Sequence, residues 1–157
     1  MLYAQDHDLQ LPYTEIPLEY WFRQIAPYAG SETGVSEVFR CPSFKPTPPR
    51  AKGVLGAGWG NVDYVAIIDP AKTAGKIRMV NIEKPSRQAF LVDGSLASNV
   101  GASSGARLKV AVNARTGHRD KINAVFWDGH VETIKKPKED GWTDLFSYLT
   151  NNGPLPE

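Results

Sequence analysis

The fold is decided by the stretch Lys121-Ile122-Asn123-Ala124-Val125-Phe126-Trp127-Asp128-Gly129-His130-Val131-Glu132-Thr133-Ile134-Lys135. Two runs rich in β-branched and aromatic residues flank Asp128-Gly129, a pattern typical of a tight β-hairpin. We expect a two-residue loop in a type I′ turn, in which Asp128 and Gly129 both adopt positive φ. The chain around this stretch therefore has to supply partners for an antiparallel sheet.

The expected hairpin pairs Trp127 with His130, Phe126 with Val131, and Ala124 with Thr133. Successive side chains of a strand point to opposite faces, so this register assigns each residue to one face of the sheet. The core face is expected to carry Ile122, Ala124, Phe126 and Val131. The other face is expected to carry Asn123, Val125, Trp127, His130 and Glu132. A slip of one residue would expose Phe126 and Val131, so burial should fix the register.

Two amphipathic helices are expected, one before the strands in the sequence and one after them. Trp142, Leu145, Phe146 and Leu149 follow at i, i+3, i+4 and i+7, which predicts a short helix after the hairpin. An earlier helix is expected over residues 18–29, with Pro17 suited to its first turn and Gly30 to its end.

Short β-prone runs predict strands at residues 35–40, 62–68, 76–82, 88–92 and 108–112. The connections are too short for many crossover helices. This favours an antiparallel sheet with helices to one side, an α+β fold in a single domain over residues 1–157.

Composition limits the range of functions. The chain has 157 residues and a net charge of +1, so no strong positive field would draw it to nucleic acid, and no nucleic-acid partner is expected. The basic runs around Lys45 and Lys135 are interpreted as solvated surface. One cysteine, Cys41, excludes an internal disulfide and is interpreted as a small buried side chain at a strand end.

A further pattern begins before the hairpin, where nine residues separate His118 from Asp128-Gly129. The run from Thr116-Gly117-His118 to Asp128-Gly129 resembles the "H-X9-DG" signature of prepilin-type processing-associated proteins, a type IV pilin-like and type II secretion pseudopilin group. Three other stretches, all earlier in the chain, also resemble that family and occur in the order in which the family has them. Residues 1–8 with Leu11-Pro12 resemble the end and exit of the long pilin helix. Residues 21–28 and then Val38-Phe39-Arg40-Cys41-Pro42-Ser43 resemble its "W…L.PY…FRCPS" stretch, and Lys84-Pro85-Ser86 to Asp93 resembles its "PS…L..D" strand.

The resemblance implies a pilin-like soluble head, in which residues 1–8 end a truncated N-terminal helix packed on the antiparallel sheet. The full-length precursor would carry a leader and an apolar helix that anchors it in the bacterial inner membrane, with the head in the periplasm or outside. It implies a non-enzymatic structural subunit whose partners are other pseudopilins or pilins and secretion-system components. One departure is Leu9-Gln10, where the family commonly has a glycine and an aromatic residue.

The motif residues also allow a metal site. His118, Asp128 and His130 are weak candidate ligands for a structural metal ion, and no other cofactor is expected. In the simpler interpretation, His118 bonds a backbone carbonyl and fixes the loop before the hairpin, while Asp128 has an ordinary role in the turn.

Two other functions remain as alternatives. Hydrolysis lacks support, because no Gly-x-Ser-x-Gly elbow occurs and Ser95, Ser103 and Ser104 have no identifiable base. An extracytoplasmic carbohydrate- or ligand-binding module is the stronger alternative, since exposed Trp59, Tyr64 and Trp127 could stack on sugar rings.

Overall fold

The computed structural model describes residues 5–8, 10, 24–30, 39, 41–43, 63–67, 81–94, 101–113, 118, 120–138, 140–150 and 153. The elements within them are the 3-10 helices η1 (Ala26–Ala29) and η4 (Pro85–Arg87), the strands β1 (Tyr64–Ala66), β2 (Ala89–Asp93), β3 (Lys121–Phe126) and β4 (Val131–Lys135), and the helices α3 (Gly105–Asn113) and α4 (Trp142–Leu149). The strands form one antiparallel sheet in the order β1-β2-β3-β4. The predicted α+β class is confirmed.

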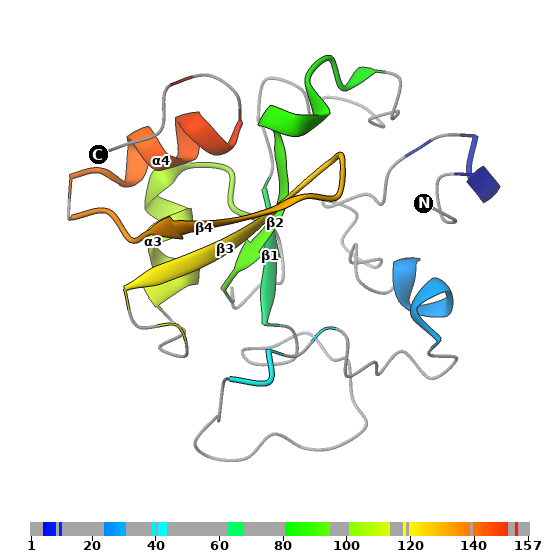
Figure 1. Ribbon diagram of the computed structural model, residues 1–157, viewed down its shortest axis with the longest axis horizontal. Helices are drawn as coiled ribbons and strands as arrows, with labels where there is room; N and C mark the ends of the chain where they lie inside the picture. The colour runs from blue at the N-terminus through cyan, green and yellow to red at the C-terminus, as the bar shows by residue number, and fades with distance from the viewer. Residues whose placement is uncertain are drawn as a thin grey trace.

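One face of the sheet packs against α3 and α4, which lie next to each other (Figure 1). The buried side chains between them include Val92 and Phe126 from the sheet, Leu108 from α3, and Leu145 and Leu149 from α4. Of the two apolar clusters formed by the described residues, this is the larger, and it forms the main core. The buried residues of β3 alternate along the strand and those of α4 follow the helical period, so both elements present an apolar face to this core.

A smaller apolar cluster lies on the opposite face of the sheet from the main core. Ala26 in η1, Phe39 and Ala66 are buried together, and Phe90 and Leu91 of β2 pack against them. Ala66 neighbours Val65 of the main core, and adjacent residues of a strand point to opposite faces. The segment around η1 and Phe39 therefore covers part of the face that α3 and α4 leave open.

The hairpin has a three-residue loop and not the expected two-residue loop. Val125 pairs with Val131 and Ala124 with Glu132, while Phe126 N donates to His130 O at 3.0 Å and Gly129 N to Phe126 O at 2.9 Å. Of the loop residues only Gly129 has positive φ, at 91°. This fits a type I turn closed by a left-handed glycine, so the predicted type I′ turn is wrong.

The longer loop shifts β4 by one residue relative to the prediction. Val131 consequently turns out of the core and is 58% exposed, whereas Ile134 is buried opposite Ile122. The core assignments of Ile122, Ala124 and Phe126 are confirmed, but that of Val131 is wrong. Sequence alternation located the faces of β3, but it could not count the residues in the loop.

The predicted strand at 108–112 is instead part of α3. Its buried residues are Gly105, Leu108, Ala111 and Val112, which follow the helical period, and Val110 between them is 52% exposed. Leu108 and Val112 fit both periods, so Ala111 distinguishes helix from strand. An added Cβ on Gly105 would lie 2.6 Å from the Trp142 carbonyl oxygen, so this glycine permits the close approach of α4.

Several other predictions are confirmed by the described residues, and two strand predictions are not. Strands at 62–68 and 88–92 and the helix from Trp142 to Leu149 are confirmed as β1, β2 and α4. Gly30 ends η1 in a left-handed conformation with φ of 74°. Asn81 and Ile82 are not in a strand, and Phe39 lies in a helical turn. The other residues of the predicted strands at 35–40 and 76–82 lie outside the described part, as does Pro17.

The N-terminal residues show a short helical turn. Gln5 and Asp6 are helical, and Asp8 follows with φ of 53°. The Tyr28 hydroxyl of η1 donates to Asp6 Oδ2 at 3.0 Å, and the His7 ring meets Tyr28 edge-on. This turn lies within the residues expected to end a longer helix, and Asp6 and His7 contact η1. That it belongs to a longer helix packed on the sheet stays a prediction. Among the described residues, no helix combines the length and hydropathy needed to cross a lipid bilayer.

Candidate functional site

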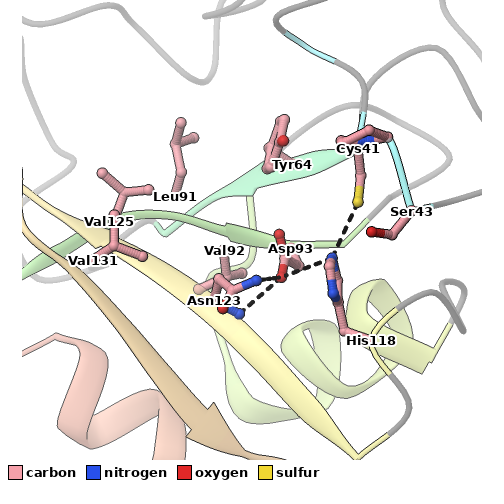
Figure 2. A pocket seen from close by; sticks show the side chains of 11 residues that line it. Cys41, Ser43, Tyr64, Leu91, Val92, Asp93, His118, Asn123, Val125 and Val131 are labelled. Atoms are coloured by element: carbon pink, nitrogen blue, oxygen red, sulfur yellow. Dashed lines mark hydrogen bonds and ion pairs between the residues drawn. The ribbon is translucent and has the colours of Figure 1, made fainter.

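Three residues far apart in the sequence meet at one corner of the sheet (Figure 2). His118 Nε2 lies 3.1 Å from Cys41 Sγ and 3.6 Å from Asp93 Oδ2. Cys41 belongs to the "FRCPS"-like stretch, Asp93 ends the "PS…L..D"-like strand, and His118 begins the H-X9-DG-like run. We call Cys41, Asp93 and His118 the Cys41 cluster.

Asp93 is held in place by its neighbour in the sheet. It is the last residue of β2, and its Oδ2 accepts hydrogen bonds at 2.8 Å from both the backbone N and Nδ2 of Asn123 in β3. The Thr133 hydroxyl of β4 donates to Asn123 Oδ1 at 2.8 Å. A polar row thus crosses three strands and compensates the burial of a carboxylate that is 8% exposed.

Cys41 is attached to the sheet by its backbone. Its N–H donates to Asp63 Oδ2 at 2.9 Å, and Asp63 N donates back to Phe39 O at 2.9 Å. Asp63 is 2% exposed and directly precedes β1. These two bonds hold Phe39 and Cys41 beside β1, where the thiol meets His118.

His118 lies three residues before β3, and its carbonyl oxygen accepts a hydrogen bond from Lys121 N at 2.9 Å. Its ring contacts a thiol, where we expected a backbone carbonyl. Both ring contacts involve Nε2, so the cluster differs from a hydrolytic triad, in which the carboxylate binds the other ring nitrogen. The arrangement can exchange a proton between thiol and imidazole next to a negative charge.

A cavity of about 300 Å³ opens beside the cluster. One end is polar, with Cys41, Asp93, His118 and Asn123. The other end is apolar, and it is lined by Leu91, Val125 and the exposed Val131, with Tyr64 at the side (Figure 2). Burial raises the pKa of Tyr64, and negative charge on Cys41, Asp93 and Asp63 raises it further.

The other half of the motif lies at the far end of β3. Asp128 Oδ1 accepts hydrogen bonds from the His130 backbone N at 3.1 Å and contacts His130 Nδ1 at 2.5 Å. The contact lowers the pKa of Asp128 and raises that of His130. His130 also stacks on Phe126, with ring centroids 4.4 Å apart. Asp128 and Gly129 therefore shape the hairpin tip.

The three candidate metal ligands do not converge. Asp128 and His130 contact each other, but β3 separates them from His118 by roughly 17 Å of strand. No group of three or more His, Cys, Asp or Glu side chains placed to hold a metal ion occurs in the described part of the chain.

The aromatic candidates are also separated. Trp127 packs on Phe90, with ring centroids 4.3 Å apart, whereas Tyr64 lines the cavity. Phe90 is the extra residue of a bulge in β2, which turns it toward the hairpin. Trp59 lies outside the described residues.

The sequence by itself does not identify this site. It indicates strand ends at Cys41 and Asp93, but no local pattern links either residue to His118, and Asn123 resembles an ordinary outward-facing residue. The available signal is that Cys41, Asp93 and His118 each lie in a stretch with the same family resemblance.

Comparison of the chain with protein-family models, curated proteins and solved structures finds no match.

Proposed function

We propose that this chain is the soluble head of a pseudopilin-like structural subunit, serving a type II secretion or type IV pilus-like assembly, and that it is not an enzyme. One observation carries the proposal. Three separate stretches that resemble one family's motifs contribute Cys41, Asp93 and His118 to a single cluster.

The convergence matters because each stretch is a weak match when taken alone. Unrelated chance matches have no reason to meet in space, whereas the parts of one inherited pattern do. Cys41 and Asp93 are 52 residues apart in sequence, yet His118 contacts both. This contact between the three residues supports treating the three stretches as parts of one pattern.

The contacts also suggest what the pattern does. The cluster ties the segment at Cys41 and the approach to β3 onto the sheet, and Gly129 closes the hairpin at the other end of β3. Each of these contacts fixes a loop or chain segment next to the sheet. A rigid head is what a packed filament subunit requires. In the Cys41 cluster the thiol and the carboxylate face the same ring nitrogen of His118, unlike in a hydrolytic triad.

The proposal includes the setting of the full-length protein. An apolar N-terminal helix preceding residues 1–8 would anchor it in the inner membrane, with the head in the periplasm or outside. Its partners would be other pseudopilins or pilins and components of the secretion system.

The deciding experiment is to sequence the gene upstream of the codon for Met1. We expect a basic leader, a cleavage junction and about 20 apolar codons, enough to span a bilayer. Co-expression with a prepilin peptidase should then shorten the precursor, and a peptidase active-site variant should leave it intact. A stop codon and ribosome-binding site directly before Met1 would refute the assembly role.

A second candidate is an extracytoplasmic ligand-binding module, favoured by the cavity beside Tyr64. Its volume and its combination of an apolar end with a few polar groups resemble small-molecule sites. Chemical-shift changes at Tyr64 and Val131 upon titration with mono- and disaccharides would support it, and shifts confined to Trp127 would not.

A further inference from the structure

We propose that Cys41 is a site of reversible thiol modification, at which a small disulfide carrying positive charge forms a mixed disulfide with Sγ while His118 takes the thiol proton. The inference stands on the cavity and the cluster, and it does not depend on the assembly role.

Access to the thiol comes through the cavity. Cys41 is buried, at 8% exposure, which usually makes a cysteine inert. Here, however, the residue lines a space of about 300 Å³, equal to the liquid volume of about ten water molecules. A small reagent can therefore reach Sγ without the chain unfolding, whereas a bulky one cannot.

The proton acceptor is already in contact with the thiol. His118 Nε2 lies 3.1 Å from Sγ, and the His118 side chain is 30% exposed. When the ring hydrogen is on Nδ1, Nε2 is the acceptor for the thiol hydrogen. This nucleophile-and-base pair is the usual way in which a protein activates a thiol.

Charge selects the reagent. The Asp93 carboxylate lies 3.6 Å from the nitrogen that becomes positive in the reaction, and Asp63 binds the Cys41 backbone. Both carboxylates are almost completely buried, so their charges are weakly screened by solvent. A disulfide with ammonium groups should therefore enter more readily than one with carboxylates.

The reaction is an ordinary thiol–disulfide exchange. The Sγ–H bond breaks, the proton passes to His118 Nε2, and Sγ attacks one sulfur of the reagent. The reagent's S–S bond breaks, and its second half leaves as a thiolate that is then protonated. Cys41 is oxidised to the disulfide level, and the released half is reduced to a thiol.

The test compares two reagents of similar length and opposite charge, cystamine and 3,3′-dithiodipropionate. The 157-residue chain is treated with each at pH 7, and intact mass gives the rate of modification. Cys41 is the only cysteine, so each modified chain is modified there. The same two rates measured in denaturant give the reactivity of Cys41 in the unfolded chain, to which the folded chain is compared. We expect folding to raise the ratio of cystamine to dithiodipropionate rates about tenfold.

Variants assign the roles. His118→Gln should slow the cystamine reaction at least tenfold. Asp93→Asn should reduce the charge preference, while the Asp63 carboxylate keeps part of it. His130→Gln is the matched control, a histidine at the hairpin tip, and should leave the rate unchanged. Circular dichroism checks that each variant is folded, and the ratio for the unaltered protein tests the proposal even if a variant does not fold. The proposal would be overturned if the ratio of cystamine to dithiodipropionate rates were the same in the folded and the unfolded chain. It would also be overturned if Cys41 were modified no faster than the whole chain unfolds.

Discussion

Asn123 has two functions at the sheet corner, because its backbone and its side-chain amide both bind Asp93 Oδ2. Hydrogen bonds to a charged group contribute more than those between neutral groups. The geometry of the Cys41 cluster therefore depends on Asn123, which is one of the nine unspecified residues between His118 and Asp128.

Replacing this amide gives the first prediction. Asn123→Ala should lower the free energy of unfolding by about 1.5–3 kcal/mol, because the Asp93 carboxylate loses one of its two donors. Thr133→Ala, which removes only the neutral hydroxyl bond to Asn123, should cost about 0.5–1.5 kcal/mol. Urea denaturation measures both, and equal losses would show that the charged bond has no special weight.

The hairpin tip gives a prediction about pH. The pKa of His130 is raised, so its contribution to stability is complete below the unfolded value of about 6.5 and is lost as pH rises through the folded value. The pKa of Asp128 is lowered, so its contribution is complete above about 3.9 and is lost as pH falls through the folded value. The melting temperature of the native chain should therefore exceed that of His130→Gln most near pH 5, with little difference at pH 9. Asp128→Asn should abolish the same difference, and a gap that persists at pH 9 would contradict the pairing.

At the scale of elements, the sequence predicted those whose apolar pattern fits one period. Trp142, Leu145 and Leu149 fit only a helix, and the β3 pattern fits only a strand. Two predictions were wrong for physical reasons: the type of α3 and the register of β4. Leu108 and Val112 fit both periods, and the register of β4 depends on a loop length that hydrophobic alternation does not encode. The Cys41 cluster could not be predicted, since its three residues meet only in the folded chain.

The hairpin loop can be tested at Gly129. This residue has φ of 91°, and an added Cβ would meet nothing within 4 Å, so substitution costs backbone strain alone. Gly129→Ala should destabilise by about 1–2 kcal/mol, and Gly129→Asn should cost less because asparagine tolerates this region better. Gly129→Val should cost more than either, since β-branching disfavours positive φ. Thermal denaturation ranks the three, and equal losses would argue against a left-handed residue here.

The contact between α3 and α4 gives a second test of packing. At Gly105 an added Cβ would approach the Trp142 oxygen and Thr143 Cα to within 2.7 Å, and both are backbone atoms that cannot move away cheaply. Gly105→Ala should cost about 1–3 kcal/mol despite the better helix propensity of alanine. Arg107→Ala, on the exposed side of the same helix, should change stability by less than about 0.5 kcal/mol in urea denaturation. Stabilisation by Gly105→Ala would mean that α3 and α4 are less closely packed.

At the scale of the whole molecule, the sheet separates two unequal apolar clusters, and the Cys41 cluster belongs to the smaller side. Phe39 is 3% exposed there and also accepts the Asp63 hydrogen bond. Phe39→Ala should cost about 3–5 kcal/mol. Hydrogen exchange should rise first at Cys41 and Asp63, while amides of β3 and α4 remain protected. Uniform loss of protection would show that the two sides unfold as one unit.

The edge of the sheet at β4 has a consequence for self-association. Lys121 and Lys135 lie directly opposite each other, and Lys135 is exposed on the last strand of the described sheet. Like charges across a strand pair weaken the hairpin slightly, but lysine on an outer strand also repels an incoming strand from another chain. The hairpin thus gives up a little stability for protection against the addition of a strand from another chain at Lys135.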